Sequence, residues 1–275
     1  MLFFNKNFSD INPTCYAIST QKEIFKRIVK DILSGDKFAK IHEVNKLPYL
    51  ISSYSSKLIK TGRGIDPVLQ ENKAVNIDLA CRKINGIIID VGEVFSFWHT
   101  VGKTSRKNGY KDGRVIIKGK LQPGLGGGLC NLAHTINRMI LDSTLDVTEF
   151  HKHSDALAPD HGERVPFIAG TSISYNYIDY RCKNNTNQRF QLCLWCEDGV
   201  LYGELHSDKD IPYRYEIVEE DHHFIKQNEK YYRRSKIYRK TINKENNQEI
   251  NKDFIWDNKS EVMFAYDMIQ KDLIR

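Results

Sequence analysis

A run of three glycines ends just before a cysteine, and this is the clearest chemical feature of the sequence. Residues 122–130 read QPGLGGGLC, and the apolar stripe that follows predicts a helix from Leu129 to Leu141. Cys130 would then lie in the first turn. There the positive end of the helix dipole stabilises a thiolate and lowers the pKa of the thiol. The backbone N–H groups of residues 126–129 are candidates for an oxyanion hole. The alternative is a buried structural cysteine at a tight helix–sheet contact.

A thiol nucleophile needs a base, and three histidines follow within a short stretch. His151 and His153 lie two residues apart, so they share one face if this segment is a strand. We expect His153 to act as the base and Asp160 to orient it. His134, one helical turn after Cys130, is a less favourable candidate, because side chains on one helix tend to lie parallel.

The same motifs of the sequence also suggest a metal site or a phosphate-binding site. The His-x-His spacing with a third ligand would suit zinc, although it is not diagnostic, and we assign no metal and no cofactor. The glycine loop lacks the Gly-Lys-Ser/Thr ending of a phosphate-binding loop. Cys193 and Cys196 have CxxC spacing, but residues three apart on a strand point to opposite faces.

Composition limits the classes of protein that this chain can belong to. The 275 residues are 40% hydrophobic and 28% charged, an ordinary globular balance. The net charge of +6 is too mild to indicate a nucleic-acid partner. No run of about 18 apolar residues predicts a membrane span. The first residues do not read as a secretory signal, and six irregularly spaced cysteines do not indicate a disulfide framework, so we expect a cytoplasmic protein.

Two further helices are expected before the glycine loop. Thr20 and Glu23 form a capping box, apolar residues recur every four positions from Ile24, and Gly35 ends the helix. The polar stretch 52–63 is expected to be a connector. A second helix is predicted over residues 77–85, capped by Asn76.

Strands dominate the rest of the predicted fold. Residues 87–91, 92–98 and 114–118 are expected to be strands or extended segments, whereas the glycines of 122–130 exclude regular structure there. Residues 190–196, an Asp198-Gly199 turn and residues 200–205 predict a hairpin. The last 65 or so residues are polar and weakly patterned. The pattern predicts an α+β fold with a mixed or antiparallel sheet, a central helix behind the glycine loop and an N-terminal helical segment.

A series of short motifs in a fixed order resembles the VanW-like family. The matching segments are LPY (47–49), QENK (70–73), GEVFSFW (92–98), GYKDG (109–113), GKL (119–121), PGLGGGLC (123–130), HS (153–154), PD (159–160), YNYID (175–179), NNT (184–186) and FQL (190–192). They cover roughly residues 45–210. The resemblance predicts three parts: an N-terminal helical extension over 1–45, a VanW-like domain over 46–210 and a polar, basic C-terminal extension over 211–275.

The resemblance supports only some of the candidate residues. Cys130, His153 and Asp160 match the family motifs, whereas His134 and His161 do not. Asn131 stands where the family usually has Gln, one methylene longer. The residues expected to bind a ligand are Gly126, Gly127, Gly128, Leu129 and Asn131.

The family resemblance implies a link to vancomycin or glycopeptide resistance, or to cell-envelope metabolism, without supplying a mechanism. From the residues, the preferred hypothesis is a Cys-dependent hydrolase or acyl transferase acting on a small-molecule or cell-wall-related substrate. The alternative hypotheses are a non-catalytic ligand-binding or accessory module and, third, a zinc protein.

Overall fold

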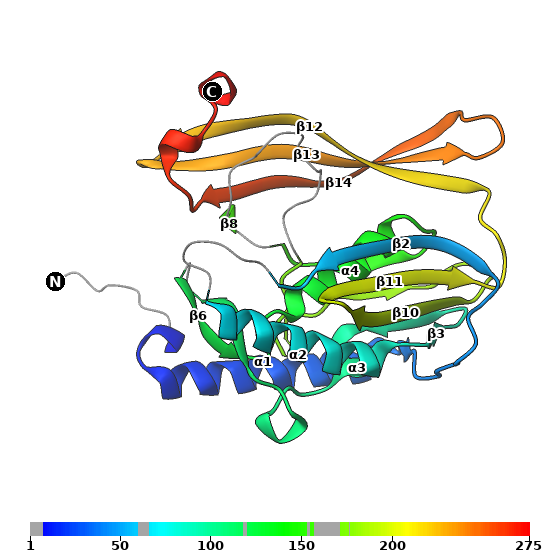
Figure 1. The fold of residues 1–275 in the computed structure, drawn as a ribbon, viewed down its shortest axis with the longest axis horizontal. Helices are drawn as coiled ribbons and strands as arrows, with labels where there is room; N and C mark the ends of the chain where they lie inside the picture. Colours follow the sequence, from blue (N-terminus) through cyan, green and yellow to red (C-terminus); the bar gives the residue numbers. More distant parts are fainter. Residues whose placement is uncertain (1–7, 60–65, 118–119, 153–154, 157–170, 176) are drawn as a thin grey trace.

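Helices and sheets are interleaved along the chain, so the α+β prediction is confirmed. The computed structural model describes residues 8–59, 66–117, 120–152, 155–156, 171–175 and 177–275 (Figure 1). Its α-helices are α1 (Pro13–Ser34), α2 (Pro67–Ile84), α3 (Phe97–Val101) and α4 (Leu129–Leu141). Four short 3₁₀ helices are η1 (Phe8–Asp10), η2 (Arg106–Asn108), η3 (Tyr266–Met268) and η4 (Lys271–Leu273).

A four-stranded antiparallel sheet lies at the centre of the fold. Its order is β2 (Tyr49–Lys57), β11 (Val200–Ser207), β10 (Phe190–Glu197) and β3 (Ile87–Ile89). Helix α2 packs on β10, and α4 packs on β2 and β11, with the two helices in contact. Fully buried Ile77 and Ile84 of α2, Ile136 of α4 and Leu192 of β10 belong to one hydrophobic core. The helix that carries Cys130 is therefore held by the main core.

A second, smaller sheet has the order β1 (Lys37–Phe38), β4 (Glu93–Ser96), β9 (Arg181–Lys183) and β7 (Asp146–Glu149). Strand β1 is parallel to β4, and the other pairs are antiparallel. A separate hairpin, β5 (Asp112–Ile117) and β6 (Lys120–Leu125), leads directly into the glycine loop.

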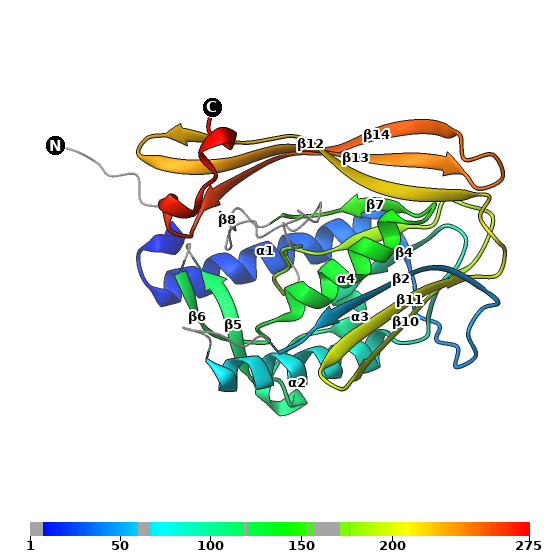
Figure 2. The ribbon, with the colours of Figure 1, turned by 45° about the horizontal axis from the view of Figure 1, so that its top comes forward.

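The C-terminal residues form a third sheet of long strands. Its order is β12 (Tyr213–Gln227), β13 (Lys230–Asn243), β14 (Glu249–Val262) and the short β8 (Asp155–Ala156). Figure 2 shows this sheet as a layer lying across the rest of the molecule. The weak patterning of these residues did not predict strands of this length, which rest on backbone pairing between neighbours.

The helix ends were predicted better than the helix starts. Helix α4 has the predicted bounds, and Gly35 follows α1 in the left-handed conformation (φ 70°). However, α1 begins at Pro13 and α2 at Pro67, each with proline in its first turn. Asn12 and Asp66 cap them by accepting backbone N–H bonds, so the predicted caps at Thr20 and Asn76 were wrong.

Two predictions of irregular structure were also wrong. The first half of the expected connector 52–63, residues 52–57, lies in β2, which pairs with β11 through backbone hydrogen bonds that do not depend on its polar side chains. Residues 122–125, expected to be irregular, belong to β6, because they pair with residues 112–115 of β5. Glycine at position 124 leaves room for the Val115 side chain, which a Cβ there would approach to 2.6 Å. The Asp198-Gly199 turn is confirmed, with positive φ at both residues.

Candidate functional site

Cys130 lies in the first turn of α4, as predicted. Gly128 caps the helix at φ 102°, a conformation that disfavours other residues, and its carbonyl accepts a hydrogen bond from the Asn131 N–H at 2.9 Å. Gly126 also has positive φ, at 74°. The glycines therefore turn the chain sharply from β6 into α4.

The glycine loop is fixed by a fully buried asparagine of α2. The Asn76 side chain donates to the carbonyls of Gly127 and Lys111, both at 3.0 Å, and accepts from the Lys111 N–H at 2.8 Å. A Cβ on Gly127 would lie 2.3 Å from the carbonyl carbon of Gly113. A Cβ on Gly128 would lie equally close to the Lys73 side chain. Close packing against protein thus accounts for glycine at these two positions.

The Cys130 side chain is half-buried, and the pKa of its thiol moves in the direction opposite to the one expected. Burial raises the pKa, while backbone hydrogen bonds from Ile173 and from Cys130 itself only partly offset it. The sulfur is 3.9 Å from the Ile173 carbonyl, to which it donates. In the free protein this thiol is therefore protonated at neutral pH.

Asn131 follows Cys130 on α4 and carries a polar side chain next to the thiol. Asn131 donates from Nδ2 to the Ser56 hydroxyl of β2 at 3.2 Å. Its Oδ1 is enclosed and has no hydrogen-bond partner in the described part of the chain. An acceptor of this kind, one residue from the thiol, suits a ligand N–H group.

Only some of the residues predicted to act with the thiol are among those that the structure describes. His153 and Asp160, like His161, lie outside the described residues, so their places as base and orienting residue stay predictions. His151 is described, and its ring nitrogen contacts Glu149 at 3.0 Å. The His134 ring packs edge-on against Tyr54, with centroids 6.2 Å apart.

The described residues do not form the metal site that the cysteine and histidine spacing suggests. Among them, no three His, Cys, Asp or Glu side chains are arranged to hold a metal ion. Cys193 and Cys196 do not act together: Cys196 instead contacts Cys81 of α2, with the sulfurs 4.0 Å apart. The interpretation of the CxxC spacing as coincidental agrees with this geometry.

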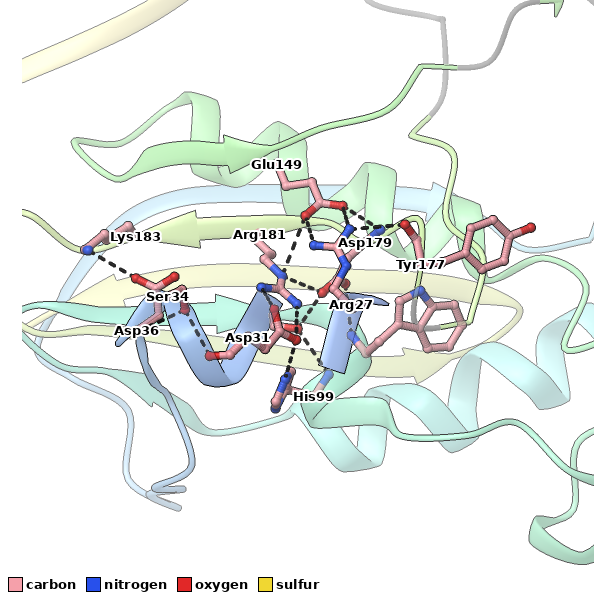
Figure 3. A network of polar contacts seen from close by, with 12 residues as sticks. Arg27, Asp31, Ser34, Asp36, His99, Glu149, Tyr177, Asp179, Arg181 and Lys183 are labelled. Carbon is pink, nitrogen blue, oxygen red and sulfur yellow. Dashed lines mark hydrogen bonds and ion pairs between the residues drawn. The ribbon is translucent and has the colours of Figure 1, made fainter. Parts of the chain in front are cut away.

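A network of ion pairs, which sequence reasoning missed, joins α1 to the small sheet (Figure 3). Arg27 forms two hydrogen bonds with Glu149 at 2.5 Å. Arg181 contacts Asp31 at 2.7 and 2.9 Å and Asp179 at 2.8 Å. These partners are up to 150 positions apart, so no local pattern could have indicated them.

The pKa values of two carboxylates in this network, Asp31 and Glu149, are lowered. Burial acts to raise the pKa of Asp31, but hydrogen bonds from Arg181 and His99 outweigh it, and the pKa lies below its ordinary value. The pKa of Glu149 is likewise lowered, because hydrogen bonds from Arg27 and the Asp179 N–H outweigh burial. The network is structural, since its arginines are paired with its carboxylates.

A pocket of about 480 Å³ lies at the other end of α4, beneath the C-terminal sheet. It is lined by Asn137, Leu141, Leu145, Asp146, Val147, Phe150, Lys152, Arg239, Phe254, Ile255 and Trp256. The volume and the apolar lining are typical of small-molecule sites. Asn137 is 1% exposed, and its Nδ2 lacks a hydrogen-bond partner among the described residues.

Comparison with known proteins identifies the family. A family model described as VanW like protein matches residues 72–206. The vancomycin B-type resistance protein VanW of Enterococcus faecalis is 27% identical over 219 residues, which are 79% of each chain. This chain belongs to the VanW-like family. The uncharacterised protein YoaR of Bacillus subtilis is 29% identical over 118 residues, 43% of this chain and 37% of YoaR. No solved structure matches the chain.

The VanW-like match includes the glycine loop, Cys130, His153 and Asp160, and the elements from most of α2 to most of β11. Helix α1, strand β1 of the small sheet, strand β2 of the central sheet and the strands β12–β14 lie outside it. The candidate thiol site therefore belongs to the VanW-like part of the chain, whereas one wall of the pocket comes from the C-terminal sheet.

Proposed function

We propose that this VanW-like protein acts in glycopeptide resistance or cell-envelope metabolism as a Cys-dependent hydrolase or acyl transferase. The name of its Enterococcus faecalis relative supports the biological setting. The chemical part rests on one observation: a thiol in the first turn of α4, directly after a rigid glycine loop. The division into residues 1–45, 46–210 and 211–275 and the cytoplasmic location stay predictions.

In the proposed reaction, the Cys130 sulfur attacks the carbonyl carbon of an amide or ester. Because the thiol starts protonated, His153 takes its proton as the C–S bond forms, and Asp160 orients the imidazole. Of the N–H groups of residues 126–129, those of Gly126 and Gly127 donate to the carbonyls of Lys111 and Gly124. The N–H groups of Gly128 and Leu129 therefore stabilise the oxyanion in this proposal. Collapse of the tetrahedral intermediate breaks the bond to the leaving amine or alcohol, which receives the proton from His153. Water or an acceptor amine then attacks the thioester and restores the thiol.

Asn131 has a positioning role in this proposal. Its enclosed Oδ1 accepts an N–H of the substrate, which places the reacting carbonyl over the thiol. The contact of its Nδ2 with Ser56 fixes the orientation of the amide.

An activated ester tests the proposal without knowledge of the natural substrate. With p-nitrophenyl acetate, we expect a burst of p-nitrophenolate and an acetyl adduct on the Cys130 peptide by mass spectrometry. Cys130→Ala should abolish both, and His153→Ala should slow the burst by about 10²–10⁴-fold. Cys196→Ala is the matched control and should retain the burst. Acetylation that persists in Cys130→Ala would refute the nucleophile.

The pocket favours a second candidate, the non-catalytic ligand-binding module. Its lining combines aromatic side chains with two cations, Lys152 and Arg239, one carboxylate, Asp146, and the Nδ2 of Asn137, which has no partner among the described residues. Such a lining suits an anionic ligand that carries a ring or alkyl group. Asn137 lies seven residues after Cys130, about 10 Å along the helix, so the pocket and the thiol are separate.

The fluorescent anion 8-anilinonaphthalene-1-sulfonate is a probe of the second candidate. We expect saturable binding that Arg239→Gln weakens and that Cys130→Ala leaves unchanged. Arg82→Gln, on the exposed side of α2, is the control and should bind normally. Binding that is unaffected by Arg239→Gln would remove the pocket as the site.

A further inference from the structure

The polar face of helix α1 points toward the protein. Arg27 and Asp31 lie one turn apart on this face and form the ion pairs with Glu149 and Arg181 described above (Figure 3). The side chains of these four residues are 14% exposed or less. Helix α1 is therefore attached to the small sheet by charges, and none of its residues is buried among apolar side chains of the core.

The apolar face of α1 points toward solvent. Its exposed apolar residues are Ile18, Phe25, Ile28, Val29, Ile32 and Leu33. At 3.6 residues per turn, these six positions fall within about 140° of the helix circumference. Phe25, Ile32 and Leu33 are 67%, 75% and 79% exposed. The apolar period noted in the sequence is thus present, but it faces solvent, which is the reverse of the orientation in an ordinary surface helix.

Lysines line one edge of this apolar face. Lys22, Lys26 and Lys30 recur every four residues, and all three are exposed. Of the acidic residues of α1, Glu23 pairs with Lys26 at 2.7 Å, and Asp31 belongs to the ion-pair network. The outward surface of α1 is therefore apolar and positively charged.

We propose that α1 docks lengthwise on an anionic lipid surface. The apolar residues would enter the boundary between headgroups and acyl chains, and the lysines would contact the lipid phosphates, as interfacial amphipathic helices do. In the described ranges no helix is both long enough and apolar enough to cross a bilayer. In the proposed complex α1 lies in the plane of the surface, because its charged face is held by Glu149 and Arg181 and only its apolar face is open to lipid. Because ion pairs join α1 to β7 and β9, docking of the helix places the whole VanW-like part at the membrane.

Geometry favours a lipid surface over a second copy of the chain. One face of a 22-residue helix, about 33 Å long and 10 Å wide, offers roughly 300–400 Å². A stable protein–protein interface needs about 800 Å² from each partner. Antiparallel pairing of two α1 helices would also bring the two lysine edges together, with repulsion between like charges.

Co-sedimentation of the full chain with vesicles tests this proposal, independently of the chemistry at Cys130. We expect binding to phosphatidylcholine vesicles that contain phosphatidylglycerol and little binding to phosphatidylcholine alone. The double variant Phe25→Ser, Ile32→Ser should lose binding. Lys22→Gln, Lys30→Gln should weaken it by roughly tenfold or more. Val44→Ser, which removes a fully exposed apolar side chain from outside α1, is the control and should bind as the wild type does.

All substituted side chains are exposed, so the variants should keep the thermal midpoint of the wild type, which circular dichroism checks. Failure of the wild type to bind anionic vesicles would overturn the proposal, as would binding that survives the double substitution. Sedimentation equilibrium supplies the competing outcome. A dimer that Phe25→Ser, Ile32→Ser dissociates, without vesicle binding by the wild type, would assign the face to a second copy instead.

Discussion

The Cys130 thiol experiences two opposing effects. Its place in the first turn of α4 favours the thiolate, by about 2 kcal/mol at most. Burial favours the neutral thiol and can shift a pKa by several units, each worth about 1.4 kcal/mol. Burial dominates here, and the pKa is raised. A nucleophilic role therefore requires a base that removes the thiol proton during the reaction, because the thiol is protonated in the free protein.

Alkylation of each cysteine as a function of pH checks this balance. We expect Cys130 to react with iodoacetamide at a midpoint above the free-thiol value of about 8.5, because burial raises its pKa. Cys196 should react at a lower pH, since its contact with the Cys81 thiol lowers its pKa. Peptide mass spectrometry reports both sites in one sample. A Cys130 midpoint well below that of Cys196 would contradict this order.

Asn76 determines the shape of the glycine loop. Asn76→Leu removes three hydrogen bonds and leaves the Gly127 carbonyl and the Lys111 N–H without this partner, whereas the Lys111 carbonyl keeps its bond from the Gly126 N–H. We expect a loss of about 2–4 kcal/mol in the free energy of unfolding, measured with urea. Asn72→Leu, which removes a single bond to the Asp112 carbonyl, is the control and should cost about 1 kcal/mol. Equal losses would show that the loop does not depend on Asn76.

At the scale of elements, α1 depends on charges rather than on apolar packing. The lowered pKa values of Asp31 and Glu149 mean that the unfolded state binds more protons than the folded state as the pH falls. Their contribution to stability is present above the unfolded pKa values of about 4 and is lost as the pH falls through the lower, folded values.

Urea unfolding between about pH 3 and pH 7 tests the role of this network. We expect the wild type to lose stability steeply below about pH 4, and Asp31→Asn to be less stable at neutral pH with a flatter acid dependence. Asp78→Asn, in the exposed pair with Arg82 on α2, should leave the profile almost unchanged. A wild-type profile that coincides with that of Asp31→Asn would refute the contribution of the network.

At the scale of the whole molecule, the C-terminal sheet contacts the VanW-like part through a few aromatic and aliphatic side chains. Trp256 of β14 stacks on Phe150 with ring centroids 4.9 Å apart. Leu141 of α4 and Ile237 of β13 form a small buried cluster beside this stack. The main core is separate from this cluster, so the sheet is joined to the rest by a limited interface.

Trp256→Ala should loosen this interface selectively. We expect faster amide hydrogen exchange in β13 and β14 with little change in β10 and β11, because the central sheet has its own core. The loss in stability should be about 1–3 kcal/mol, less than for a fully buried tryptophan. Ile250→Ala, at an exposed position of β14, is the control. Uniform acceleration throughout the chain would instead indicate one cooperative unit.

The sequence by itself determined the elements whose signals are local. Helix α4 follows from a glycine cap and an apolar stripe of helical period, and the β10–β11 hairpin follows from alternating side chains around Asp198-Gly199. The VanW-like motifs, including the segment that ends in Cys130, were also readable, because they are short runs in a fixed order. Local conformation and short motifs do not depend on distant residues.

Only the tertiary structure decided the features that depend on distant partners. The polar strand β2 exists because β11 offers it backbone hydrogen bonds, and the long C-terminal strands pair with one another. The same apolar period in α1 fits a buried or an exposed face, and the ion pairs with β7 and β9 select the exposed one. Burial, a property of the packed chain, likewise decided the direction of the Cys130 pKa.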